Sequence, residues 1–301
     1  MRRFASAAVR RLCSWPLRLS GRRARAEILE SLAEQSIQAI DTPGGQIRFY
    51  APSPLLLSRA DSLLSKEPDT IKWIDGFEDG DVLWDIGANV GVFSLYAAIA
   101  KVSSVIAFEP LAANFHVLSR NVQLNRLDGR MRAYCIAFAE RTQLGVLNAA
   151  SPSMGASLGH FGKAGERSPY CGVESTVAQS VIGFSIDDFI SQFDPPFPNH
   201  LKIDVDGLEI EILEGACATL HDSRLRSVLV ELSLNRREEH DAAVRILEAA
   251  GFHFSSRGDT QESNNESAAN HLFRRIPTAA AQAMTGSLEC PCNAESAELR
   301  K

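Results

Sequence analysis

The middle of the chain alternates short apolar runs with segments of helical periodicity. Short apolar runs rich in β-branched residues are typical of buried strands, whereas apolar residues three and four apart indicate helices. Strands are predicted at residues 82–86, 104–108, 131–137, 201–205 and 227–232. Helices are predicted between them at residues 91–100, 112–125, 208–219 and 238–250, and residues 252–255 and 271–276 are expected to form a final antiparallel pair. This alternation predicts an α/β protein with a mainly parallel sheet.

The same pattern divides the chain into three parts. Residues 1–45 are expected to hold a basic leader and a short helix at residues 27–38, which a Pro-Gly-Gly turn follows. Residues 46–276 form the main domain, and residues 277–301 read as a tail outside the core. Within the domain, residues 142–182 are rich in Gly, Ser and Pro, which favours an inserted loop or hairpin that serves as a substrate lid.

Charge separates the leader from the rest of the chain. The 301 residues carry a formal charge of −6, but residues 1–25 contain eight arginines and no acid. The rest of the chain is therefore acidic, which argues against nucleic acid as a binding partner. The leader fits a membrane-surface helix on anionic lipid, a mitochondrial transit peptide or a solvated segment, and these alternatives stay open.

Other global features bear on location. No apolar run reaches the roughly 18 residues that a membrane span requires. The six cysteines have no metal-ligand spacing, which indicates a reduced, intracellular protein. A cytoplasmic location is expected, with peripheral membrane contact through residues 1–25 as an addition. The oligomeric state is not predicted.

A glycine-rich turn follows the first predicted strand of the parallel sheet. Gly87 and Gly91 flank Asn89 there, and Asp85 precedes them by two residues. Such a turn lets a ligand approach the backbone and the free N–H groups of a helix start. Glu109 ends the next predicted strand, 22 residues after Gly87, where a carboxylate would accept hydrogen bonds from ribose hydroxyls. The pattern predicts a nucleoside site.

Asp85 indicates which nucleoside binds. A dinucleotide pyrophosphate avoids a nearby carboxylate, and the third glycine of the dinucleotide fingerprint is absent. A sulfonium ligand with an ammonium group tolerates that acid, which favours S-adenosylmethionine over NAD. The structural alternative is that Asp85 and Asn89 only tie the turn and cap the helix.

A second group of charges lies at the predicted strand 201–205. Lys202, Asp204 and Asp206 alternate with apolar residues, so they point to one side of the strand. Charges at the end of a buried strand are costly unless they are paired or used, and Glu231 is a further partner for them. Asp204 is expected either to position the donor and acceptor or to act as a general base. Asp204, Asp206 and Glu209 could instead hold Mg²⁺, or form only a turn and a helix start.

The histidines form no set with metal-ligand spacing, and no metal site is predicted from them. His160, in the Gly/Ser-rich insert, is the one histidine that we select as a candidate base.

Six sequence blocks together resemble the FkbM family of S-adenosylmethionine-dependent methyltransferases. In chain order they are DIGANVGVFS (85–94), AFEP (107–110), NVQLN (121–125), GASL (155–158), SIDDF (185–189) and LKIDVDGLEIEILEGA (201–216). The resemblance implies a class I methyltransferase fold, which is a Rossmann-like, doubly wound, seven-stranded sheet with one antiparallel strand. It also implies methyl transfer to a hydroxyl of a saccharide or a polyketide-type natural product.

The resemblance also implies roles for individual positions. The implied cofactor-binding residues are Asp85, Gly87, Ala88, Asn89, Gly91, Glu109, Pro110, Ala137 and Phe138. Asp204 would lie near the transferred methyl group, and Asp206 replaces the glutamate that is usual in the family. Two alternatives remain: a nucleotide-cofactor oxidoreductase, and a non-catalytic protein of the same fold docked to a membrane assembly.

Overall fold

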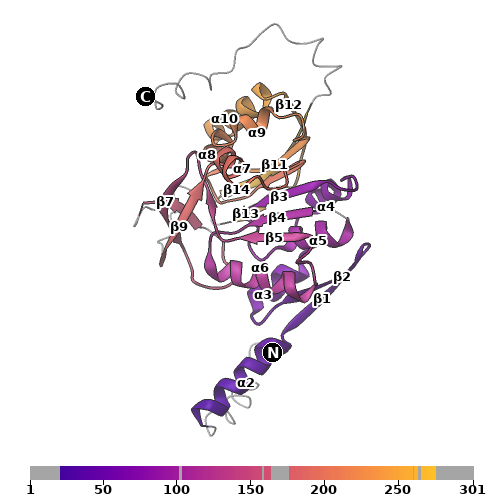
Figure 1. Cartoon of the computed structure of the whole chain (residues 1–301), viewed down its shortest axis with the longest axis vertical. Helices are drawn as coiled ribbons and strands as arrows, with labels where there is room; N and C mark the ends of the chain where they lie inside the picture. The colour runs from indigo at the N-terminus through magenta and orange to yellow at the C-terminus, as the bar shows by residue number, and fades with distance from the viewer. Residues whose placement is uncertain are drawn as a thin grey trace.

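A mainly parallel sheet forms the centre of the protein (Figure 1). The computed structural model describes residues 21–101, 104–157, 159–163, 176–259, 261–263 and 266–275. The strand order is β12-β14-β11-β10-β3-β4-β5, and only β14 runs against both of its neighbours along this path. The strands are β3 (Val82–Ile86), β4 (Ser104–Phe108), β5 (Met131–Tyr134), β10 (His200–Ile203), β11 (Ser227–Ser233), β12 (Phe252–Arg257) and β14 (Glu266–Arg275). A short strand, β13 (Gln261–Ser263), pairs with β14. The predicted α/β fold with one antiparallel strand is confirmed.

Alternating strand residues face two helical layers. Trp84 and Ile86 belong to one apolar core, whereas Leu83 belongs to the other. The first core is covered by α7 (Ile186–Phe193), α8 (Glu209–Glu214), α9 (Cys217–His221) and α10 (Arg237–Ala249). The second is covered by α4 (Pro68–Asp75), α5 (Val92–Ala100) and α6 (Ala112–Leu124). Figure 1 shows the helices of each layer on opposite sides of the sheet.

The insert forms a second sheet, where a loop or hairpin was expected. Its strand order is β6-β9-β7-β8. The members are β6 (Ala137–Phe138), β7 (Gln143–Ala149), β8 (Gly159–Gly162) and β9 (Val177–Phe184). Gly145 and Gly183 leave room for the Phe161 ring, because a Cβ at either position would lie 2.4 or 2.6 Å from it. Phe161 thereby joins the main apolar core.

Two predicted elements are divided in the structure. The strand expected at 131–137 becomes β5 and β6, which belong to different sheets. The helix expected at 208–219 breaks into α8 and α9 at Gly215. A Cβ on Gly215 would lie 2.4 Å from the carbonyl oxygen of Ala139, so the chain passes close to β6 there.

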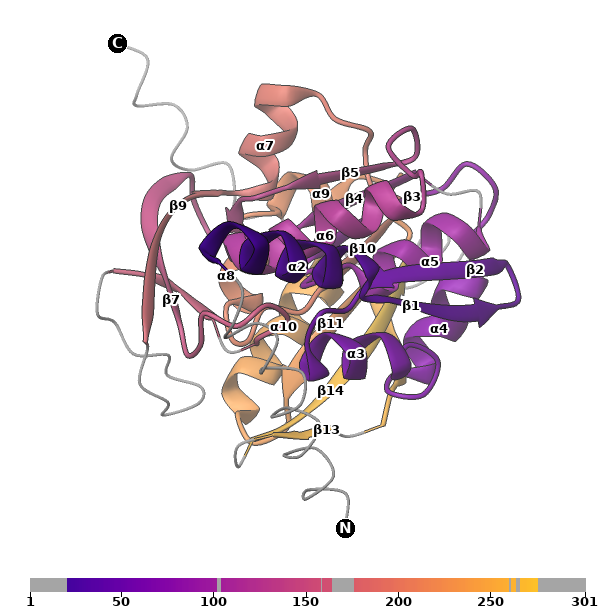
Figure 2. The ribbon, with the colours of Figure 1, turned by 90° about the horizontal axis from the view of Figure 1, so that it is seen from below.

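The N-terminal part adds elements that the sequence pattern did not reveal. A hairpin of β1 (Ile37–Thr42) and β2 (Gly45–Tyr50) follows α2 (Arg22–Gln35), which has no buried residue, and α3 (Pro54–Asp61) comes next. The boundary expected at residue 45 falls inside this hairpin. Asn121 of α6 and Asn125, which caps the end of that helix, accept hydrogen bonds from the backbone amides of Tyr50 and Arg48, so β2 is tied to the domain. Seen from below (Figure 2), the hairpin lies in front of α5.

Residues 1–20 and 276–301, with most of the leader and the tail, lie outside the described residues. Within the part that the structure describes, no helix is long and apolar enough to cross a membrane. Cys135 is a free thiol but Cys217 is disulfide-bonded, so the prediction of reduced cysteines is wrong at Cys217.

Candidate active site

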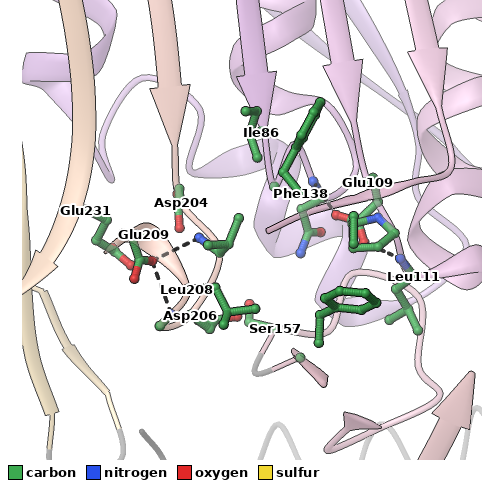
Figure 3. Close-up of a pocket in the computed structure, with 18 of the residues that line it drawn as sticks. Ile86, Glu109, Leu111, Phe138, Ser157, Asp204, Asp206, Leu208, Glu209 and Glu231 are labelled. Atoms are coloured by element: carbon green, nitrogen blue, oxygen red, sulfur yellow. Dashed lines mark hydrogen bonds between the residues drawn. The ribbon is translucent and has the colours of Figure 1, made fainter. Parts of the chain in front are cut away.

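A cavity of about 490 Å³ opens at the carboxyl ends of β3, β4, β10 and β11 (Figure 3). Ligands of open α/β sheets bind at this edge. Most of the predicted site residues line it: Gly87, Asn89, Glu109, Pro110, Ala137, Phe138 and Asp204. Ala88 and Asp85 border a smaller adjoining cavity of about 50 Å³, next to Lys202.

The turn after β3 needs glycine at residue 87. The backbone of Gly87 has φ +82°, which disfavours a side chain, and a Cβ there would lie 1.8 Å from the carbonyl oxygen of Asp204. The turn after β3 and the turn after β10 therefore contact each other at Gly87. Asn89 also has a positive φ, of 53°, which asparagine tolerates better than most residues.

Glu109 is buried at the end of β4 and faces the cavity. One carboxylate oxygen accepts a 2.8 Å hydrogen bond from the Asn89 amide, and the other accepts one of 2.8 Å from the Leu111 amide. Burial raises the pKa of Glu109 to about 7, although these hydrogen bonds oppose the rise. The oxygen bound by Leu111 also accepts a long hydrogen bond of 3.5 Å from the Asn114 side chain, whereas the other oxygen keeps a second lone pair that can accept a hydrogen bond from a diol.

Apolar side chains form the wall next to Glu109. Ile136, Ala137 and Phe138 line the cavity from the segment after β5, and Leu147 and Phe161 line it from the second sheet. A flat aromatic ligand would lose water on both of its faces in such a setting. The β6 segment was predicted to form this wall.

Lys202 places a positive charge next to Asp204 and Asp85, across the glycine turn from Glu109. Its ammonium nitrogen lies 2.6 Å from a carboxylate oxygen of Asp204, and its side chain is only 2% exposed. Burial opposes ionisation of Asp204, but the Lys202 charge and hydrogen bond bring the pKa of Asp204 below its ordinary value. Burial raises the pKa of Asp85 despite the Lys202 charge. Asp85 accepts a hydrogen bond from Ser94.

Further carboxylates line the cavity beyond Asp204. Glu209 accepts hydrogen bonds from the amides of Val205 and Gly207, at 3.2 and 3.1 Å, and burial raises the pKa of Glu209 to about 8. Asp206 has φ +58° in the turn after β10, and Glu231 lies in the last half of the neighbouring strand β11, two residues before the strand ends at Ser233. Figure 3 shows Glu231 beside Glu209, close to Asp204.

Two predicted residues do not reach the cavity. His160 is buried in β8 between Gly159 and Phe161, which both line the cavity. Because strand residues alternate, His160 points to the opposite face, so its expected role as a base at this site is not supported. Gly91 also lies away from the cavity. Its φ is +83° and a Cβ would lie 2.5 Å from Leu118, so helix packing rather than ligand access requires this glycine.

The sequence reading missed a clamp over one side of the cavity. Arg59 of α3 donates two hydrogen bonds to the carbonyl oxygen of Gly155 and another to Ser157. Asn89 and Asn114 both donate to the carbonyl oxygen of Ala156. The GAS segment of the insert is thus held against the glycine turn. The local sequence gave no signal of this contact, because Arg59 and Gly155 are 96 residues apart.

Among the described residues, no group of three or more His, Cys, Asp or Glu side chains is arranged to hold a metal ion. The proposed Mg²⁺ ligands are otherwise engaged, since Asp204 pairs with Lys202 and Glu209 accepts backbone hydrogen bonds.

The family model of the methyltransferase FkbM domain matches residues 85–254, which is more than half of the chain. The chain belongs to the FkbM methyltransferase family. It is therefore an S-adenosylmethionine-dependent methyltransferase. This membership decides against the oxidoreductase alternative, and the matched region contains both the glycine turn and the carboxylate cluster.

Relatives of this FkbM methyltransferase include two curated proteins. One is the hexuronic acid methyltransferase AglP of Haloferax volcanii, 26% identical over 68% of this chain and 77% of its own length. The other is methyltransferase 1 of Beauveria bassiana, also 26% identical, over 58% of this chain and 74% of its own. Among solved structures, the FkbM methyltransferase of Methylobacillus flagellatus KT matches with a TM-score of 0.44 and 16% identity. That match covers 82% of this chain and 59% of the other.

Proposed function

We propose that this methyltransferase modifies a hydroxyl of a saccharide or a polyketide-type natural product. The observation that carries the proposal is the division of one cavity into two ends. Glu109 and the apolar wall lie at one end, and the cluster around Asp204 lies at the other. The name of the relative from Haloferax volcanii, a hexuronic acid methyltransferase, favours a saccharide as the acceptor.

The first end suits the adenosine part of S-adenosylmethionine. Glu109 would accept hydrogen bonds from the ribose hydroxyls, and Ala137 and Phe138 would pack against the adenine. Gly87 leaves the turn open to the ligand. When bound, the cofactor supplies an electrophilic methyl group on a positively charged sulfur atom.

Residues near Lys202 would bind the charged end of the cofactor. Asp204 stays ionised through its contact with Lys202, so its carboxylate favours positive charge at that point of the cavity. Asp85, with Gly87 and Ala88, borders the small cavity on the same side. Asp204 is therefore proposed to position the donor and the acceptor.

Catalysis would depend on placement and on exclusion of water. The positive charge of the donor sulfur is dispersed toward the acceptor oxygen as the two react, so an ordered site that excludes water favours the reaction. The clamp of Arg59 on Gly155 would close the insert over the bound molecules.

The experiment is a transfer assay with S-adenosylmethionine labelled on its methyl group. The acceptor probes are glucuronic acid, a neutral methyl hexoside and a macrolactone alcohol. The proposal expects the label on an oxygen of at least one probe, located by the methoxy signal in NMR spectra of the product. Label found only on nitrogen or carbon in a wider acceptor screen would contradict it.

A further inference from the structure

Glu231 lines the cavity next to Asp204 (Figure 3). β10 and β11 are parallel, with Ile203 beside Val230, so the next residues along, Asp204 and Glu231, are neighbours where β10 ends. Both line the cavity, and Figure 3 shows their side chains at the same end of it. Glu231 therefore lies at the end of the cavity where Asp204 is proposed to position the donor and the acceptor.

The other acids at this end are held by partners. Asp204 pairs with Lys202, Glu209 accepts two backbone hydrogen bonds, and Glu239 lies 3.4 Å from a guanidinium nitrogen of Arg236. The Glu231 carboxylate, by contrast, forms no hydrogen bond or salt bridge with any residue in the described ranges. Its oxygens are therefore available to a bound molecule.

We propose that Glu231 is the catalytic general base of the reaction. As the acceptor oxygen bonds to the methyl carbon, the carbon–sulfur bond breaks and its electron pair stays on the sulfur. The hydroxyl proton passes to a Glu231 carboxylate oxygen, so the products are a methyl ether, a neutral thioether and a protonated Glu231. This inference rests on the proposed hydroxyl acceptor.

The electrostatics of the cluster suit this role. The charge of Asp204 raises the pKa of Glu231 well above its ordinary value, and burial and the charges of Asp206 and Glu209 add to the rise. A carboxylate with such a pKa is a stronger base than the Asp204 carboxylate, whose pKa is lowered. Asp204 therefore stays ionised, whereas Glu231 accepts the proton.

The first test compares Glu231→Gln with Glu238→Gln, a change at an exposed residue of α10. With any acceptor that the wild type methylates, Glu231→Gln should lower kcat by roughly 10²-fold or more and remove the acidic limb of the kcat–pH profile. Glu238→Gln should keep both. His240 also lines the cavity, so His240→Gln is the rival variant. If Glu231→Gln keeps the wild-type profile, or if only His240→Gln loses the acidic limb, the proposal is overturned.

The second test needs no acceptor. The full chain, labelled with ¹³C at the glutamate carboxyl groups, is titrated by NMR without cofactor. Glu109 and Glu209 should also titrate above the ordinary glutamate range, so the expected change is the loss of one such resonance in Glu231→Gln that remains in Glu238→Gln. The presence of that resonance in Glu231→Gln would contradict the inference. Failure of every acceptor probe would count against the proposed function alone, because this titration would still test the state of Glu231.

Melting temperature and cofactor affinity together distinguish a catalytic role of Glu231 from a structural one. Removing one charge from a crowded group of carboxylates relieves repulsion, so Glu231→Gln should melt at or above the wild-type temperature. S-adenosylmethionine affinity should stay within about twofold of wild type, since Asp204 and Glu109 are intact. A melting temperature clearly below that of Glu238→Gln, together with a parallel loss of affinity, would assign Glu231 a structural role instead.

Discussion

The ammonium group of Lys202 lies 2.6 Å from the carboxylate of Asp204, with the lysine side chain almost fully buried. The same positive charge also acts on Asp85 and Glu67. One buried cation therefore compensates several acids beneath the glycine turn. Burial lowers the pKa of Lys202, but these acids raise it further, so the lysine stays charged.

Replacing Lys202 by methionine should destabilise the fold strongly. Breaking a buried pair leaves an uncompensated charge, and the expected loss is about 3 kcal/mol in the free energy of unfolding, measured by urea denaturation. Lys72→Met, at an exposed position of α4, is the matched control and should change stability by less than about 0.5 kcal/mol. Equal effects of the two changes would show that Lys202 does not compensate the acids.

Alanine at Gly87 should cost more than alanine at another glycine of similar conformation. Gly80 has φ +87° with nothing within 4 Å of a built Cβ, whereas at Gly87 the Cβ would collide with the Asp204 backbone. Gly80→Ala should therefore lose only the conformational part, about 1 kcal/mol. Gly87→Ala should lose more and also weaken S-adenosylmethionine binding, measured by calorimetry. Equal losses in both variants would mean that the close contact does not matter.

Cofactor affinity should depend on pH through Glu109. The pKa of about 7 means that this carboxyl is protonated below neutral pH, and a protonated oxygen accepts hydrogen bonds poorly. The Kd of S-adenosylmethionine should rise as pH falls from 7 to 5, by up to about tenfold per unit. Glu109→Gln has no carboxyl at this position and should lack this part of the dependence. A wild-type Kd that follows that of Glu109→Gln at every pH would be inconsistent with the assignment.

His200 should make the fold sensitive to acid. Its two ring nitrogens lie 2.7 Å from the Ser227 hydroxyl and 2.8 Å from an Asp81 oxygen, and burial lowers the pKa of His200 to about 4. Between pH 4 and 6.5 the unfolded chain binds a proton that the folded chain does not. The free energy of unfolding therefore falls as pH drops through this window, by at most about 3 kcal/mol.

The measurement is urea denaturation across pH 4 to 7. His200→Gln should lose the His200 part of the slope, and His253→Gln, at an exposed position of β12, should keep it. Similar slopes in wild type and His200→Gln would refute this prediction.

The glycine turn, Glu109 and the strand ends were predictable because each depends on neighbours close in sequence. A strand, a turn and a helix start occur within Asp85 to Gly91, and alternation within one strand places Lys202 and Asp204 on one side. The fold class follows from the same local patterns, which explains why the mainly parallel central sheet is confirmed although the strand expected at 131–137 is divided between two sheets.

Contacts between distant segments were not predictable. His160 was chosen from its polar, glycine-rich surroundings, but the pairing of β8 with β7 sets which face it occupies. The hydrogen bonds from Arg59 to Gly155 join α3 to the insert, and neither residue carries a local signal of the contact. The availability of Glu231 depends on which neighbouring acids already have partners, a property of the assembled cluster.

The most direct test of the cofactor site is a calorimetric titration with S-adenosylmethionine at pH 8, where Glu109 is ionised. The wild type should bind one molecule per chain, and Glu109→Ala should bind at least tenfold more weakly, since a hydrogen bond to a charged group contributes about 1.5–3 kcal/mol. Glu238→Ala should bind as the wild type does. No binding by the wild type, or equal binding by Glu109→Ala, would contradict the account.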